Sequence, residues 1–291
     1  EGIVELMGPD PTDGALAAGL SVHQALSALD RLEVRGRDSA GIQLLVTGHG
    51  LDLESPQVQA LLDERRYPFF GSGAVRTPEG ALSFVYKAAA EIGELGDNTA
   101  AIRSAVLGDE LLHLALESPD AWTMVLGHTR WASVGIISEA NAHPQSSEEL
   151  AAVSALQRGS TGGDTQPFTT AVLNGDVDNH ADLAAAETLQ LPAEVTTDAK
   201  VIPVLWSRRL AEGQDSEVAF RNAVAPMEGS VAIAANSAAR PGELMLALRG
   251  SGQALYVGLA DDAFVIASEP YGVIEETASY VRMDGETPSD P

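Results

Sequence analysis

The residue types with the clearest chemistry gather in one glycine-bracketed stretch near the middle of the chain. Residues 125–144, VLGHTRWASVGIISEANAHP, place His128, Arg130, Trp131 and His143 within sixteen positions. An arginine can hold a carboxylate through two parallel hydrogen bonds. This combination of side chains therefore indicates a substrate-binding loop.

Three further polar motifs stand at predicted strand ends and turns: RGRDSAG at 35–41, Asn174-Gly175 after a buried strand, and Thr197-Asp198 at a helix start. Asn-Gly supplies a side-chain amide and a backbone N–H, the components of an oxyanion hole, and an aspartate can bind an ammonium group. Singly, each motif also fits a structural role, such as a turn at Asn174 or a helix N-cap at Asp198. Together they indicate recognition of an α-amino acid whose acyl group is to be cleaved.

Other kinds of site find little support in the motifs. The six histidines are not spaced as in HExxH or in a Cys/His zinc site. The Gly-Ser-Gly segments at 71–73 and 250–252 complete no phosphate-binding motif and are predicted to be turns. Ser133 lies in a segment one glycine short of a nucleophile elbow, which disfavours a serine hydrolase. We therefore expect no metal and no cofactor.

Composition narrows the class of protein. The chain has 291 residues, of which 45% are hydrophobic and 20% charged, as is ordinary for a soluble globular protein. Its net charge of −25 is spread along the chain, so nucleic acid and anionic membranes would repel it. The absence of cysteine excludes disulfides, thiolate metal sites and cysteine nucleophiles. With no apolar run of membrane length and no basic leader, we expect a cytoplasmic protein.

The elements that must position these motifs are predicted in separate runs. Strand patterns occur at 1–8, 41–46, 123–126, 169–173, 230–235, 244–248, 254–258 and 263–267. Helical patterns occur at 15–32, 84–92, 99–116, 179–189, 198–210 and 216–225. Such runs favour a layered α+β domain over an alternating parallel sheet. The region at about 48–119 carries no motif and is interpreted as a helical insertion with a loop.

At this point the motifs carry a resemblance. The chain resembles the class II glutamine amidotransferase domain, an N-terminal nucleophile domain that stands at the front of glucosamine-6-phosphate synthase. That family opens with Cys-Gly-Ile-Val, continues with Arg-Gly-x-Asp-Ser-Ala-Gly, and has Gly-His-Thr-Arg-Trp-Ala-Thr followed by Ser-Glu-x-Asn-Ala-His-Pro. The chain matches these motifs in order at 2–4, 35–41, 127–132 and 138–144, with further similarity at 174–175, 197–198, 250–259 and 264–269. The Gly-His-Thr-Arg-Trp motif indicates the sugar-phosphate branch.

The resemblance implies a four-layer αββα sandwich and L-glutamine or L-glutamate as the ligand. Arg130 is similar to the residue that binds the glutamine α-carboxylate, and Asp198 to the one that binds its α-amino group. Asn174 and Gly175 would form the oxyanion hole. The other matched positions are Trp131 and Ser133 on the loop that closes the site, His143 in the closing region, and Arg35 near the nucleophile.

Position 1 departs from the family pattern. The family's nucleophile is an N-terminal cysteine, and its own α-amino group, with a pKa of about 7.7–8.0, serves as the base. Glu1 stands at that position, and a carboxylate is a poor nucleophile towards an amide. Loss of a catalytic nucleophile costs on the order of 10⁶ in turnover. We therefore predict a pseudoenzyme that lacks the glutaminase step. Ser133 for threonine and Val134 for a usual histidine are smaller departures.

We expect the amidotransferase domain to span residues 1–283 and residues 284–291 to form a linker or tail. The family also implies a sugar-phosphate isomerase domain in a longer protein, and we expect a homo-oligomer. Two alternatives remain open: a non-catalytic regulatory domain that binds glutamine or glutamate through Arg130 and Asp198, or a structural oligomerisation domain whose pocket is filled. Glutamine binding without ammonia release would favour the regulatory domain.

Overall fold

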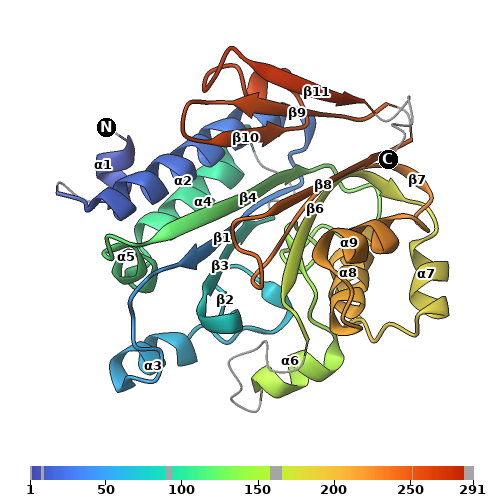
Figure 1. The fold of residues 1–291 in the computed structure, drawn as a ribbon, viewed down its shortest axis with the longest axis horizontal. Coiled ribbons are helices and arrows are strands. Elements are labelled where there is room, and N and C mark those ends of the chain that lie inside the picture. Colours follow the sequence, from blue (N-terminus) through green and yellow to red (C-terminus); the bar gives the residue numbers. More distant parts are fainter. Residues whose placement is uncertain (1, 8–9, 90–93, 158–165, 251, 285–291) are drawn as a thin grey trace.

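Two four-stranded antiparallel sheets lie face to face at the centre of the fold (Figure 1). The computed structural model describes residues 2–7, 10–89, 94–157, 166–250 and 252–284. The first sheet has the order β2 (Val75–Arg76), β3 (Leu82–Ala88), β1 (Ser39–Thr47) and β4 (Trp122–Arg130). The second has the order β5 (Gln145–Ser146), β6 (Thr169–Val177), β7 (Gly229–Ser237) and β8 (Leu244–Arg249).

Helices cover the outer face of each sheet. On the first sheet lie α1 (Gly2–Met7), α2 (Asp13–Leu32), α4 (Asp97–Leu107) and α5 (Glu110–Leu116), with α3 (Pro56–Asp63) near the end of β2 (Figure 1). On the second lie α8 (Val201–Ala211) and α9 (Ser216–Val224), with α7 (His180–Ala186) beside them and α6 (Leu150–Gln157) below (Figure 1). These layers confirm the predicted α+β class and the αββα sandwich.

A third, smaller sheet follows at the end of the chain. It has the order β10 (Phe264–Ala267), β9 (Ala254–Leu259) and β11 (Tyr280–Asp284), and all its pairs are antiparallel. The short 3-10 turns of the chain are η1 (Glu33–Arg35), η2 (Pro68–Phe70), η3 (Pro78–Gly80), η4 (Asp198–Lys200) and η5 (Pro270–Gly272). The third sheet meets the first layer through α2 and η5, where Arg31 donates to the carbonyl of Tyr271 at 2.9 Å.

Side chains alternate along the strands, so one face of each central sheet packs on helices and the other face packs on the second sheet. In β1, Ile42 and Leu44 are buried against the helices of the first layer, whereas Gln43 points to the other sheet. Asn236 of β7 donates to Gln43 at 2.9 Å, and Gln43 donates to the hydroxyl of Ser83 at 3.0 Å. Because buried polar groups are costly unless they are paired, these bonds hold the two sheets in one relative position.

Two of the predicted elements are wrong. Residues 84–92 were expected to be helical, but Leu82–Ala88 is strand β3, which pairs with both β1 and β2. The strand has the period of two, since Leu82, Phe84 and Tyr86 pack on the helices and Ser83 faces the other sheet, but the alanines at 88–90 extend the apolar pattern in a way that suits a helix equally. The region at about 48–119 therefore supplies two strands of the central sheet and is not a helical insertion.

The predicted strand at 1–8 is also wrong, because Gly2–Met7 forms helix α1. Gly19 of α2 lets this helix come close: a Cβ at position 19 would lie 2.4 Å from the side chain of Met7 and 3.2 Å from that of Ile3. Met7 packs against the cluster between the helices and the first sheet. The contact with α2 therefore decides the conformation of this short apolar segment.

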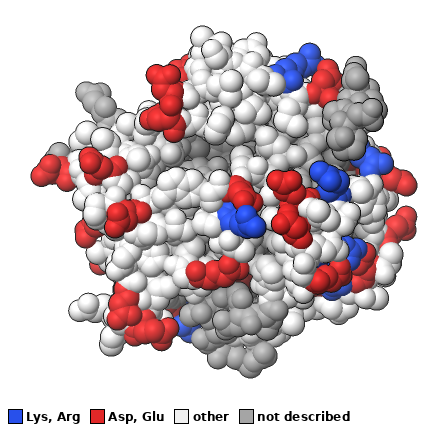
Figure 2. All heavy atoms as spheres, in the orientation of Figure 1, with Lys and Arg blue, Asp and Glu red and all other residues white. Residues whose placement is uncertain are grey.

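The acidic residues are spread over the surface. In Figure 2, red side chains are scattered across the face shown, and most blue ones adjoin them.

Within the described part of the chain, no helix combines the length and the apolar character needed to cross a membrane.

Candidate functional site

Arg130 ends strand β4 and points into the space between the two central sheets. In β4, Leu126, His128 and Arg130 alternate towards this side, while Gly127 faces Leu29 of α2. His128 and Arg130 thus lie on a strand, and only the residues after them form the loop that the sequence indicated. The Arg130 side chain is buried, with 4% of the residue exposed.

The guanidinium group of Arg130 is held by its own loop. It donates from Nη1 to the carbonyl of Ile136 at 3.3 Å and from Nη2 to the carbonyl of Val134. Among the described residues, no carboxylate lies within ion-pair distance of it. Burial lowers the pKa of Arg130, and the carboxylates of Asp198 and Asp38 oppose this effect from a greater distance. The cation is therefore buried without a directly bound anion.

Asp198 supplies a negative charge on the opposite side of the site. It opens the turn η4 and is buried, with 5% of the residue exposed. Its Oδ2 accepts a hydrogen bond from the N–H of Val177 at 2.7 Å, and its Oδ1 accepts one from the Thr197 hydroxyl at 3.4 Å. Burial raises the pKa of Asp198, and the carboxylate of Asp176 raises it further, while the Val177 N–H lowers it. An unpaired cation and an anion thus face the same space.

Asn174 and Gly175 lie inside β6, and not after a strand as the motif suggested. Asn174 is half-buried, and within the described ranges its side-chain amide has no hydrogen-bond partner. Gly175 has a φ of +111°, and a Cβ there would lie 1.8 Å from the carbonyl oxygen of Ser230 on β7. Only glycine fits this position, which lies next to the free amide of Asn174.

The loop after β4 is attached to both sides of the site. Ser133 donates a hydrogen bond to the carboxylate of Asp176 on β6, and the N–H of Ile136 donates to the Thr196 hydroxyl at 3.4 Å. Gly135 has a φ of +85°, and a Cβ there would lie 2.9 Å from the same hydroxyl. Trp131, at the start of the loop, is 75% exposed. The loop thus borders the site with its polar groups and leaves an indole ring in solvent.

His143 supports the site from beneath. Its Nδ1 accepts a hydrogen bond from the N–H of Leu173, the residue before Asn174, at 3.3 Å. Its Nε2 lies 3.4 Å from the hydroxyl of Thr197, the residue before Asp198. The ring also stacks on His128, with centroids 4.4 Å apart. His143 therefore connects the two segments of the chain that carry the polar groups of the site, and it acts as a positioning residue.

Burial keeps both stacked histidines neutral, which predicts a loss of stability in acid. Burial lowers the pKa of His128 to about 4 and that of His143 well below its usual value. Because a histidine in the unfolded chain titrates near 6.5, the unfolded state binds more protons between pH 6.5 and 4. The contribution of the neutral histidines to the free energy of unfolding is therefore fully present above pH 6.5. It is lost as the pH drops to 4, by about 3 kcal/mol for His128 alone.

Urea unfolding at pH 7.5 and pH 4.5 measures this loss, and the same pair of measurements on His128→Phe provides the control. The variant keeps a buried ring but cannot take up the proton, so its free energy of unfolding should change less between the two pH values. An equal change in both proteins would contradict the role of His128, since the many surface carboxylates titrate in both.

The structure separates Arg35 from this group and does not describe Glu1. Arg35 points away, and its guanidinium pairs with Glu269, which follows β10. Glu1 lies outside the described residues; the helix that follows it, α1, packs on α2 at the outer side of the first sheet (Figure 1). Arg130, Asn174, Gly175 and Asp198 lie on the opposite side, between the two sheets or at their edge.

Sequence reasoning missed two polar residues that shape the site. Asn141 accepts hydrogen bonds from the N–H groups of Thr196 and Thr197 at 2.7 and 2.9 Å, which fixes the segment before Asp198. Asp176 binds Ser133 and raises the pKa of Asp198. The signal for both was local: Asn141 lies in the Ser-Glu-x-Asn-Ala-His-Pro motif, and Asp176 directly follows Asn174-Gly175.

Comparisons with known proteins give sequence relatives of the chain. No family model matches the chain. The glutamine–fructose-6-phosphate aminotransferase [isomerizing] of Bacillus cereus is 28% identical over 259 residues, which are 89% of this chain and 32% of that protein. The enzyme of the same name from Methanothermobacter thermautotrophicus is 30% identical over 165 residues, 56% of this chain and 24% of that protein. The chain thus spans about a third of the length of such relatives.

Two solved structures show a weak likeness to the chain. The glutamine phosphoribosylpyrophosphate amidotransferase of Bacillus subtilis, complexed with ADP and GMP, is 18% identical, with a TM-score of 0.46 over 83% of this chain and 44% of that one. The allosteric regulatory enzyme of purine biosynthesis is 19% identical, with a TM-score of 0.49 and the same coverage. The fold assignment rests on the layers described above and not on these likenesses.

The chain is homologous to the glutamine–fructose-6-phosphate aminotransferases over 89% of its length, in agreement with the resemblance that the motifs carry.

Proposed function

We propose that this domain binds L-glutamine or L-glutamate without hydrolysing it. The observation that carries the proposal is the buried Arg130 cation, which has only neutral carbonyl partners and faces Asp198 across the site. A buried charge is costly unless an opposite charge compensates it. The carboxylate of an α-amino acid would provide that charge at Arg130, and Asp198 would receive its ammonium group.

The other end of the ligand would lie at β6. The free amide of Asn174 and the adjoining backbone at Gly175 suit a carbonyl oxygen, because donors held rigidly in a dry site stabilise it most. His143 fixes the backbone on both sides through Leu173 and Thr197. These groups would orient the side-chain amide of glutamine, but none of them is a strong nucleophile.

The nucleophile is the part that we propose is missing. The chain contains no cysteine, and Glu1 stands where the family has one. The helix Gly2–Met7 that follows it in the chain packs on α2, on the outer side of the first sheet. We therefore propose a pseudoenzyme, with the non-catalytic regulatory role preferred over a structural one.

Calorimetric titration with L-glutamine tests this proposal, with D-glutamine as the stereochemical control and an ammonia assay alongside. We expect saturable binding of the L-isomer alone and no ammonia release. A Glu1→Cys variant with a free α-amine, confirmed by mass spectrometry, should bind glutamine equally and also release no ammonia. Absence of binding would overturn the proposal in favour of a structural domain, and ammonia release by the variant would show that α1 can move into the site.

A longer protein is part of the same proposal. The relatives are about three times as long as the segment that matches this chain, and their name contains the word "isomerizing". We therefore propose that a sugar-phosphate isomerase domain accompanies this domain. We also propose that the protein forms a homo-oligomer. We place the amidotransferase domain at residues 1–283 and a linker at 284–291; strand β11 ends at Asp284. A proposed cytoplasmic location fits the net charge of −25 and the lack of cysteine.

A further inference from the structure

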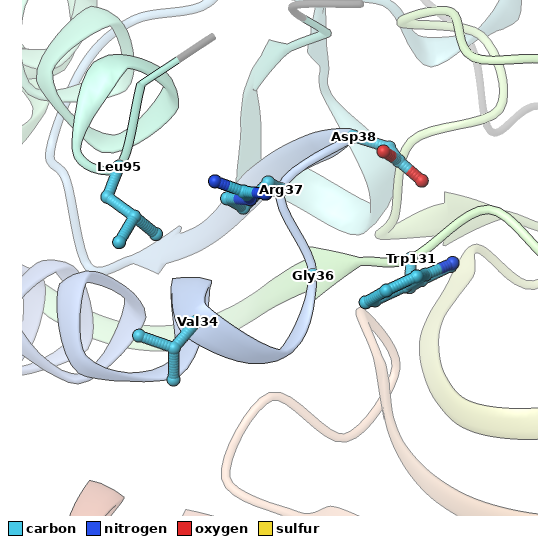
Figure 3. Close-up of a pocket in the computed structure, with 6 residues that line it drawn as sticks. All are labelled: Val34, Gly36, Arg37, Asp38, Leu95 and Trp131. Atoms are coloured by element: carbon cyan, nitrogen blue, oxygen red, sulfur yellow. The ribbon is translucent and has the colours of Figure 1, made fainter. Parts of the chain in front are cut away.

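Unpaired cations of this chain differ in whether water reaches them. Arg37 is exposed, at a surface cavity of about 350 Å³. The other residues that line this cavity are Val34, Gly36, Asp38, Leu95 and Trp131 (Figure 3). The Arg37 guanidinium has no ion-pair partner in the described ranges, and it points to the side of the backbone opposite Asp38 (Figure 3). Water compensates its charge, so this cation needs no ligand.

The two lysines of the chain, Lys87 and Lys200, are buried instead. Only 3% of each residue is exposed, and neither lies within ion-pair distance of a carboxylate in the part of the chain that the structure describes. Lysine is almost never fully buried unless it is paired, because its ammonium group loses its hydration. A chain with 42 acidic residues that buries both of its lysines in this way indicates a specific role for them.

Hydrogen bonds connect Lys200 to a buried ion pair. Lys200 Nζ donates to the carbonyl of Ser146 on β5 at 2.6 Å, and the Ser146 hydroxyl donates to Oε2 of Glu148 at 3.0 Å. The other carboxylate oxygen of Glu148 accepts a hydrogen bond from Nε of Arg76 on β2 at 2.6 Å. The carboxylate of Glu148 is thus already bound on both sides.

Lys87 extends the same cluster from β3. Its Nζ has no hydrogen-bond partner among the described residues. It lies 5.6 Å from the centre of the Phe70 ring, and the guanidinium carbon of Arg76 lies 5.8 Å from the centre of the same ring. One aromatic ring therefore faces two cations, and a cation–π contact replaces only part of the lost hydration of Lys87.

Positive charge exceeds negative charge in this cluster. Arg76, Lys87 and Lys200 are buried cations, whereas Glu148 is a buried carboxylate and Glu139 is exposed. Burial and the nearby Lys200 ammonium group lower the pKa of Lys87 to about 7, against the carboxylates of Glu139 and Glu148. Burial lowers the pKa of Lys200 to about 8. An additional negative charge between the lysines would stabilise both ammonium groups.

We propose that Lys87 and Lys200 bind a small monovalent anion of the size of chloride in the interior of the fold. The ion accepts charge-assisted hydrogen bonds from both ammonium groups and offsets the excess charge that Glu148 leaves. It must be small, because the side chains of the cluster are buried and protein interiors are closely packed. The site is independent of the proposed glutamine binding, since Arg130 and Asp198 take no part in it.

Thermal unfolding in sodium chloride and in sodium gluconate tests the inference. The two solutions have one ionic strength, because a net charge of −25 makes the folded state sensitive to screening. We expect the midpoint to be higher in chloride, by about 3 °C when the chloride concentration is ten times its dissociation constant. In Lys87→Met, which keeps an unbranched side chain of similar size, the difference between the two salts should disappear.

Arg37→Met is the matched control, because it also removes an unpaired cation but an exposed one, and it should keep the chloride effect. Anomalous scattering from crystals of the parent protein in sodium bromide locates the ion directly, and we expect a peak in contact with Nζ of Lys87 and of Lys200. Absence of that peak, or a chloride effect that persists in Lys87→Met, would overturn the assignment. Equal midpoints of the parent protein in both salts would also overturn it, by showing that Lys87 is buried as a neutral amine.

Discussion

Replacing Arg130 with alanine is expected to weaken L-glutamine binding at least a hundredfold. The variant removes a buried guanidinium whose present partners, the carbonyls of Val134 and Ile136, are neutral. Two charge-assisted hydrogen bonds to a carboxylate contribute about 1.5–3 kcal/mol each. Loss of these two bonds lowers the affinity for L-glutamine. The Asp198 carboxylate would also repel the ligand carboxylate once the Arg130 charge is gone, which lowers the affinity further. Calorimetric titration measures it directly.

Arg249→Ala is the control for this experiment. Arg249 also donates to a backbone carbonyl, that of Ala225, but it is exposed at the end of β8 and its side chain reaches the end of α9 on the helix-covered face of the second sheet. Its replacement should leave glutamine binding unchanged. Arg130→Lys keeps the charge but loses the planar pair of donors, so it should retain only part of the affinity. Equal affinities of Arg130→Ala and the parent protein, with both folded by circular dichroism, would show that the carboxylate binds elsewhere.

Replacing Gly175 with alanine is expected to lower the free energy of unfolding by more than about 3 kcal/mol and to abolish ligand binding. A Cβ at this position would lie 1.8 Å from the carbonyl oxygen of Ser230, and the φ of +111° is itself unfavourable for alanine. The clashing atom belongs to the backbone of β7, which is paired along its whole length with β6. The strands must therefore separate locally, and Asn174 moves with them.

Two other glycines divide this effect into its parts. Gly213 has a φ of +83° but open space around it, so Gly213→Ala should show only the cost of the left-handed backbone, about 1–2 kcal/mol. Gly242 has open space and no positive φ, and Gly242→Ala should be close to neutral. Urea unfolding of the three variants under one set of conditions gives the comparison. If Gly175→Ala costs no more than Gly213→Ala, contact between β6 and β7 is not the constraint at this position.

The predicted fold was most accurate where a strand or helix carried its own pattern. The long amphipathic helix α2 and strands β1, β4, β6 and β7 were predicted within a few residues, because periodicity of 3.6 or 2 records which face is buried. Strand β3 was missed although its sequence has the period of two, because the alanines at 88–90 extend its apolar pattern in a way that suits a helix equally. Helix α1 was missed because a short apolar segment suits either conformation, and its contact with Gly19 of α2 decides between them.

The candidate site shows the same division. Motif spacing predicted Arg130, Asp198, Asn174 and Gly175, and all four lie around one region of the structure. It did not predict that Arg35 would pair with Glu269, 234 positions later in the chain. It also gave no sign that Arg130 is held by its own loop, or that Arg37 would be left without a partner. Each of these facts depends on which distant segment lies within a few ångströms.

By itself, the sequence supplied the motifs that indicate an amidotransferase domain and an amino-acid ligand, and it contains no cysteine, because residue identity and short-range spacing suffice for each. Tertiary structure alone decided that His143 connects Leu173 to Thr197, that α1 lies on the outer side of the first sheet, and that Arg37 and Asp38 open onto one cavity. Hydrogen bonds, burial and electrostatic pairing act over a few ångströms in space, whereas the sequence orders residues only along the chain. The motifs thus indicated the chemistry that we propose for the site, whereas the distances between its residues depend on the folded structure.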